Sequence, residues 1–134
     1  TYPYGNYKTS ERVNFPIANE DSRLHAKAIV YGVEIGDRFK AYSQEAMKES
    51  MVVNDEVGGK KIVVIFDPGT SVARIFKSEN ETFSSSDNGV TDSKGVNWNY
   101  TGLSEDGRQL QQIVHVTSFW FAWAAFHPET ELYT

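Results

Sequence analysis

Apolar residues come in short runs separated by turn-forming residues, without the longer period of an amphipathic helix. The first pair of runs, residues 28–35 and 38–42, is rich in β-branched and aromatic side chains and is divided by a Gly-Asp pair. A second pair, 51–57 and 60–66, is divided by two glycines. Short loops of this composition close antiparallel strand pairs, so the pattern predicts two β-hairpins.

Further strands are indicated along the rest of the chain. Clusters of Gly, Ser, Asn and Asp separate them at the spacing typical of sandwiches and barrels. The expected strands are residues 72–77, 81–85, 97–100 and 109–116. We therefore expect a mainly β (α+β) fold, an antiparallel β sandwich or barrel-like domain with two short helices.

Two segments carry helix signals. Ser43 can cap a helix over residues 44–50 by accepting a backbone hydrogen bond. Near the C-terminal end, Thr117 or Ser118 is expected to cap a helix of about ten residues, which ends before Pro128 because the residue preceding a proline avoids helical backbone. This second helix is aromatic and apolar on every side, so we expect it to be buried in its own domain.

The expected core combines the C-terminal helix with the returning strand of the second hairpin, which is apolar at every position from 62 to 66 and should be buried on both faces. Its members are Phe119, Trp120, Trp123, Phe126, Ile62, Val64 and Phe66. The length of 134 residues predicts one domain, residues 1–134. Residues 1–23 show no regular period and are expected to form an irregular N-terminal arm that packs on the body or extends from it.

Composition excludes several partners and chemistries. The formal charge of −5 disfavours nucleic acid, whose binding requires clustered Lys and Arg. No apolar run is long enough for a transmembrane segment. The absence of cysteine excludes disulfides, thiol nucleophiles and thiolate metal sites. Asn80 and Asn99 begin Asn-X-Thr triplets and are candidate glycosylation sites in an exported protein.

Histidines are the natural candidates for a metal site. His25, His115 and His127 stand alone, without a His-X-His pair or helical i, i+4 spacing. We therefore favour structural roles and retain His115, His25 and Asp67 only as weak metal candidates. No cofactor is predicted.

The alternative function is a metal-binding or hydrolytic enzyme domain with a site near His115, Asn54, Asp55 and Asp67. It requires these side chains to converge on one pocket. Asp55 and Glu56 are adjacent, and neighbouring strand residues point to opposite faces, so they do not form a carboxylate pair by themselves. A carbohydrate-binding module is a third reading, and it would need Trp98 and Tyr100 to present bare ring faces.

Several motifs resemble one known family. They are Tyr-Pro-Tyr-Gly-Asn-Tyr at 2–7, Val-Asn-Asp-Glu-Val-Gly-Gly at 53–59 and Phe-Trp-Phe-Ala-Trp-Ala-Ala-Phe-His-Pro at 119–128. Together they resemble the C-terminal half of the uncharacterised exported proteins grouped as domain of unknown function 3179. The resemblance implies an extracellular or cell-surface location and a related half that precedes this one.

One departure bears on function. In the family's first half the buried strand ends in a Cys-Pro-Leu-Cys turn, whereas this chain has Asp-Pro-Gly-Thr at 67–70. Thiol chemistry therefore does not carry over. Our leading hypothesis is a non-catalytic exported or cell-surface domain that acts as a binding or assembly (structural) module, through self-association or another surface protein. Residues 2–7 and 72–77 are expected as exposed strand edges where a partner adds.

Overall fold

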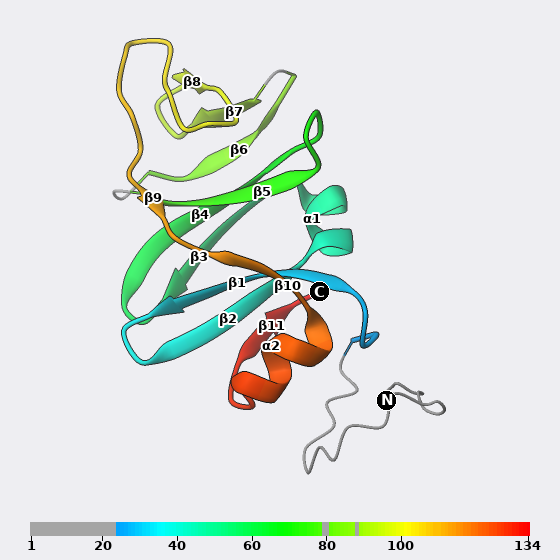
Figure 1. Ribbon diagram of the computed structural model, residues 1–134. Helices are drawn as coiled ribbons and strands as arrows, with labels where there is room; N and C mark the ends of the chain where they lie inside the picture. Colours follow the sequence, from blue (N-terminus) through cyan, green and yellow to red (C-terminus); the bar gives the residue numbers. More distant parts are fainter. Residues whose placement is uncertain (1–23, 79–80, 88) are drawn as a thin grey trace.

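The computed structural model describes residues 24–78, 81–87 and 89–134 (Figure 1). The expected arm, residues 1–23, and the triplet residue Asn80 lie outside the described residues. Most strands pair antiparallel in three sheets, and two short helices accompany them. The mainly β, antiparallel fold predicted from sequence is confirmed, and the described strands form open sheets without closing into a barrel.

The first sheet, sheet A, has the strand order β10-β1-β2-β11. The first predicted hairpin is present as β1 (Ile29–Ile35) and β2 (Arg38–Ser43). The later strand β10 (Val116–Phe119) pairs antiparallel with β1, and β11 (Glu131–Tyr133) pairs parallel with β2. Sheet A is therefore completed on both sides by residues from the last fifth of the chain.

The second sheet, sheet B, has the order β3-β4-β5-β9. The second predicted hairpin is present as β3 (Val52–Val57) and β4 (Lys60–Asp67), followed by β5 (Val72–Lys77) and the two-residue β9 (Gln112–Ile113). Gly58 in the hairpin turn has φ +58°, and a Cβ there would lie 2.3 Å from the Ile35 carbonyl oxygen. Glycine is required at this turn because backbone from the first hairpin approaches it so closely.

A third sheet, sheet C, consists of β6 (Phe83–Ser86), β7 (Gly89–Asp92) and β8 (Asn97–Trp98) in sequence order. The sheets lie in layers, with sheet B between sheets A and C (Figure 1). Strand β4 serves both interfaces, because successive strand residues point to opposite faces. Its Ile62, Val64 and Phe66 pack toward sheet A, and Val63 and Ile65 pack toward sheet C. The returning strand is thus buried on both faces.

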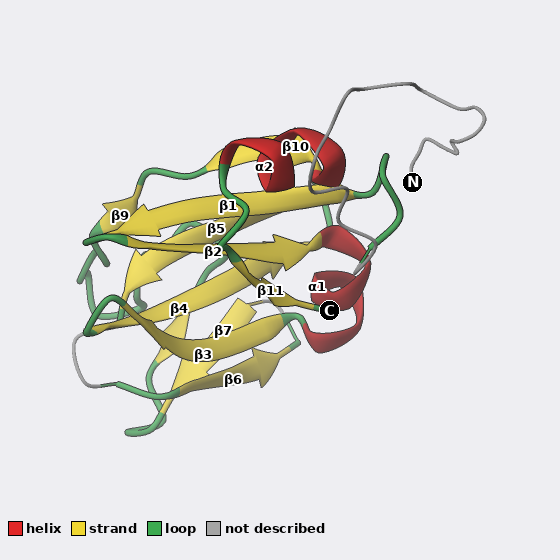
Figure 2. Ribbon diagram, turned by 90° about the horizontal axis from the view of Figure 1, so that it is seen from below, coloured by secondary structure: helices red, strands yellow, loops and turns green. Residues whose placement is uncertain are grey.

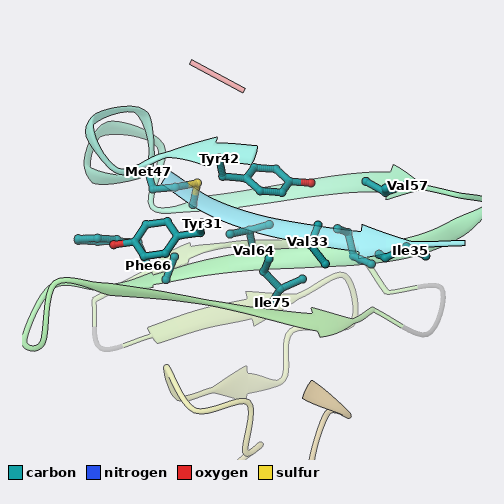
Figure 3. Close-up of a cluster of buried hydrophobic side chains, with 11 residues drawn as sticks. Tyr31, Val33, Ile35, Tyr42, Met47, Val57, Val64, Phe66 and Ile75 are labelled. Atoms are coloured by element: carbon teal, nitrogen blue, oxygen red, sulfur yellow. The ribbon is translucent and has the colours of Figure 1, made fainter. Parts of the chain in front are cut away.

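The core between sheets A and B is the largest of the molecule and contains Tyr31, Tyr42 and Ile75 among its members (Figure 3). Helix α1 (Gln44–Ser50) closes one end of this core and contacts strands of both sheets. Its N-cap is Ser43, whose hydroxyl oxygen accepts from the Ala46 N–H at 3.3 Å. The predicted first helix is therefore present with its predicted cap.

Helix α2 (Trp120–Phe126) differs from the prediction. It has seven residues instead of about ten, and it begins later because Thr117 and Ser118 are strand residues paired with Tyr31 and Val30. The N-cap is Phe119, which forms no side-chain capping hydrogen bond. Pairing with β1 satisfies the backbone of these residues, so the strand displaces the first turn of the expected helix.

Helix α2 is also not buried on every side. It lies on the outer face of sheet A, so only the stripe of Trp120, Trp123 and Ala124 is buried (Figure 2). The expectation that Phe119 and Phe126 belong to the core is wrong, since they are 45% and 80% exposed. Their positions fall outside the stripe that faces the sheet, and no further layer covers them in the described part of the chain.

Candidate functional site

Asp55 of β3 joins the two large sheets. Its carboxylate accepts from the Lys40 ammonium at 2.6 Å and from the Tyr42 hydroxyl at 2.7 Å, both from β2. Burial alone would raise the pKa of Asp55, but these two hydrogen bonds and the Glu56 N–H outweigh it and the pKa is lowered. Burial and the bond to Asp55 raise the pKa of the Tyr42 hydroxyl. Asp55, Lys40 and Tyr42 thus hydrogen-bond to one another and link sheet B to sheet A.

Asp67 ends strand β4 and organises the turn that follows. Its carboxylate accepts from the Gly69 N–H at 2.9 Å and from the Arg74 guanidinium at 3.3 Å. Burial would raise the pKa of Asp67, yet these contacts lower it. Arg74 also reaches the Tyr100 carbonyl oxygen at 3.4 Å. This carboxylate therefore fixes a turn and has its charge balanced by Arg74.

His115 lies between β9 and β10, not inside the long strand expected for 109–116. Its ring meets the edge of Tyr31 at 5.9 Å between centroids. Burial, together with the positive charge of Arg74, lowers the pKa of His115 and favours the neutral imidazole. Asp67 and His115 thus share the neighbourhood of Arg74.

Asn54 lies apart from that neighbourhood. Its side-chain amide donates to the Phe83 carbonyl oxygen at 2.8 Å and accepts from the Phe83 N–H at 2.9 Å. The side chain therefore imitates a strand neighbour and links β3 to β6. The four residues proposed for an enzyme site therefore contact different partners. Asn54 contacts Phe83, Asp55 contacts Lys40 and Tyr42, Asp67 contacts Arg74, and His115 contacts Tyr31.

The other two histidines have contacts of their own. The exposed His25 accepts from the Lys27 N–H through Nδ1 at 3.1 Å. His127, at the C-terminal end of α2, lies between Phe39 and Trp123, with ring centroids 4.1 and 4.3 Å away. Among the described residues, no three His, Asp or Glu side chains are grouped so as to hold a metal ion.

Sequence reasoning did not identify the role of Asp92. Its fully covered carboxylate accepts from the Trp98 indole N–H at 3.0 Å and from two backbone N–H groups, those of Lys94 and Val96. Burial would raise the pKa of Asp92, but these hydrogen bonds lower it. Arg108 covers the Trp98 ring at 5.0 Å, and Trp98 is only 4% exposed. The ring thus packs in the core between sheets B and C and offers no bare platform for a sugar.

Exposed apolar side chains lie along the edge strand β10. Val114 is 87% exposed and Val116 is 50% exposed, on a stretch that leads directly to the exposed Phe119. Val116 lies opposite Gly32 of β1 and therefore on the face of sheet A that carries α2. Solvent-exposed valines on a sheet edge are unusual, because native sheets commonly protect edges with charge, proline or covering loops.

The backbone of β10 is available to a further strand. Hydrogen-bonded pairs alternate along an antiparallel ladder, and the Trp120 N–H donates to the Ala28 carbonyl oxygen at 2.8 Å. By this alternation Ser118 and Val116 direct their backbone groups toward β1, whereas Thr117 directs its N–H and C=O outward. Within the described residues nothing pairs with that outward side of Thr117.

Other sheet edges are shorter or blocked. Strand β11 has three residues and β9 has two. Strand β3 is joined to β6 through Asn54. The expectation of an open edge at residues 72–77 is met only in part, since β9 pairs with β5 at Ile75 and Phe76 and no described strand pairs with residues 72–74 on that side. Of the edges in the described part of the chain, the one at β10 combines open backbone with the most exposed apolar side chains, those of Val116 and the preceding Val114.

Asn99 is the candidate glycosylation residue that the structure describes. It is exposed at a turn, where its Oδ1 accepts from the Thr101 N–H at 3.0 Å and from the Thr101 hydroxyl at 2.7 Å.

Neither described helix has the length and hydrophobicity of a membrane span.

Comparison with known proteins identifies the family. No curated protein and no solved structure matches the chain. The family model described as "Protein of unknown function (DUF3179)" matches residues 1–130, which is nearly the whole chain. The chain therefore belongs to the DUF3179 family.

Proposed function

We propose that this protein is a non-catalytic, exported or cell-surface domain that acts as a binding or assembly module. The observation that carries the proposal is the β10 edge, which combines an outward-facing backbone at Thr117 with the exposed side chains of Val114 and Val116. An open edge of this kind accepts an extended segment by main-chain hydrogen bonding, and its side chains then decide which segment fits.

The rival enzyme or metal-binding role receives less support. It requires Asn54, Asp55, Asp67 and His115 to meet around one pocket, but Asn54 and Asp55 are engaged with partners that neither Asp67 nor His115 contacts. A concave surface lies over the two hairpin turns and is lined by Asp37, Arg38, Glu56, Val57, Gly58, Gly59 and Glu131. It contains none of the four proposed residues, so nothing at that depression favours catalysis.

The exported location is proposed from the resemblance described in the sequence analysis, and Asn99 is exposed as a glycosylation acceptor must be. Both are consistent with a domain that meets its partner outside the cell.

The size of the native protein tests the proposed role. We expect untagged protein from its source to occur in complexes or ordered assemblies in the envelope or medium fraction, measured by light scattering and electron microscopy. Val116→Lys introduces a charge at the edge while leaving the buried layers intact, so it should release the protein from these complexes. A wild-type protein found free and monomeric in every fraction would contradict the proposal.

A further inference from the structure

We propose that β10 pairs antiparallel with β10 of a second copy of this chain, about a two-fold axis. This assignment of the partner rests on the binding or assembly role proposed above. The two copies of sheet A would then form one continuous sheet across the axis, with α2 of each copy on the same face.

The alternation of backbone groups restricts how two β10 strands can meet. Outward-facing groups belong to odd-numbered positions, with Thr117 as the central one. In an antiparallel pair, hydrogen-bonded partners must both be outward-facing residues, so their numbers add to an even sum. One residue of β10 therefore lies opposite its own copy, as an isologous two-fold interface requires.

Exposed apolar surface favours Val116 as that residue. With the axis at Val116, two half-exposed valines meet as a pair without hydrogen bonds, which is the closer of the two pair types. This register extends the strand by the two residues that precede β10. Thr117 of one copy then exchanges backbone hydrogen bonds with His115 of the other, and Val114 lies opposite Ser118. This register removes valine surface from water on both copies.

The charge pattern indicates that the occupant is an uncharged strand such as β10 itself. The chain carries 13 Lys and Arg and 18 Asp and Glu, yet residues 109–128 contain none of them. Two copies each carry a formal charge of −5, but at this edge neither presents a like charge to the other. An acidic or basic partner segment would find no complementary charge here, whereas a second copy meets none that opposes it.

The dimer is expected to be weak when the protein is dilute. Pairing along one short strand buries less than the roughly 1,000 Å² of a stable interface. Copies concentrated on one surface would pair more readily, because tethering raises their effective concentration. Chemical trapping is therefore a better test than size alone.

The lack of cysteine provides a direct experiment. Val116→Cys introduces a single thiol, and antiparallel pairs without hydrogen bonds hold their Cα atoms about 4.5 Å apart, within disulfide range. Under oxidised glutathione, Val116→Cys should form disulfide-linked dimers several-fold faster than Leu103→Cys, a matched control on a side chain that is 42% exposed elsewhere. Adding Thr117→Pro to Val116→Cys should slow this reaction, and circular dichroism should show an unchanged fold.

The outcomes separate this inference from the proposed function. Equal rates of disulfide formation for Val116→Cys and Leu103→Cys would overturn pairing between copies. If wild-type protein nevertheless occurs in native complexes that Val116→Lys disrupts, the edge binds a different partner and the proposed function stands without this inference. A native protein that is free and monomeric, together with equal rates, would overturn both.

Discussion

At the scale of single residues, the core between sheet A and α2 depends on the fit between Gly32 and Trp123. A Cβ at Gly32 would lie 2.4 Å from the Trp123 ring, so the ring occupies the space that any other residue would fill. The Trp123 indole N–H donates to the hydroxyl of Thr130, the residue before β11, at 2.8 Å. This hydrogen bond holds the ring in place. The φ of Gly32 is not in the left-handed region, so its backbone conformation does not require glycine. Glycine is needed at this position because the Trp123 ring approaches so closely.

Gly32→Ala is therefore expected to destabilise the protein by about 1–3 kcal/mol, since the added methyl group forces the Trp123 ring to move. Urea unfolding followed by tryptophan fluorescence measures the change. Gly69→Ala is the control, because its Cβ would meet nothing closer than 3.3 Å, the Asp67 carboxylate. Equal effects of the two substitutions would contradict this account of Gly32.

Trp123→Ala is expected to cost about 3–5 kcal/mol of unfolding free energy, because it removes a buried ring and leaves a cavity. Trp123 is 6% exposed, whereas Phe126, on the same helix, is 80% exposed. Phe126→Ala should therefore change stability by no more than about 0.5 kcal/mol. Chemical denaturation of both variants compares a buried and an exposed aromatic in one helix, and similar losses would refute the arrangement of α2.

At the scale of elements, turn residues and helix caps correctly predicted the elements that depend on neighbours in the sequence. Both hairpins were predicted from their turn residues, and α1 from Ser43. The start of α2 was not, because Thr117 and Ser118 are good caps that a distant strand, β1, recruits into a ladder. Strand β11 was missed for the same reason, since its parallel pairing with β2 joins residues far apart in the sequence.

The two serines allow a test at this scale. Ser43→Ala should cost about 1 kcal/mol, because it leaves the Ala46 N–H at the start of α1 without its side-chain partner. Ser118→Ala should cost clearly less, since that hydroxyl donates only to the neighbouring Phe119 carbonyl oxygen on the exposed strand. Thermal unfolding of the two variants makes the comparison. A larger loss for Ser118→Ala would mean that Ser118 caps α2 after all.

The candidate site shows where sequence reasoning stops. Whether a strand lies at an edge depends on the order of strands in the folded sheet, and that order brings β10 to the outside and β5 to the inside. One signal was present in the sequence, namely the stretch 109–128 without a charged residue. It was interpreted as a strand followed by a buried helix, because exposure cannot be separated from burial by apolar character alone.

At the scale of the whole molecule, the layers are held together by polar links as well as apolar cores. Asp55 joins sheets A and B, Asn54 joins β3 to β6, and Asp92 joins β7 to Trp98 of β8 within sheet C. Each carboxylate among them has a lowered pKa, so its charged form is favoured in the folded state. Acid should therefore weaken the Asp55 link between sheets A and B and the Asp92 contacts within sheet C.

The sign of this pH dependence follows from the pKa shifts. The pKa values of Asp55, Asp67 and Asp92 lie below their unfolded value of about 3.9, so their stabilisation is complete above that pH and is lost as pH falls through the folded values. The pKa of His115 is also lowered, from about 6.5, so the unfolded chain takes up its proton first and stability declines below that pH.

Acidification should therefore reduce stability in two steps. The first begins as pH falls through about 6.5, the unfolded-chain pKa of histidine, and belongs to His115, and the second, below about pH 4, belongs to the carboxylates. Urea unfolding at each pH measures both. His115→Gln keeps a polar side chain that does not titrate, so it should flatten the first step and leave the second unchanged. If the variant lost stability just below about pH 6.5 as steeply as the wild type, the partly buried, neutral His115 would not be the source of that step.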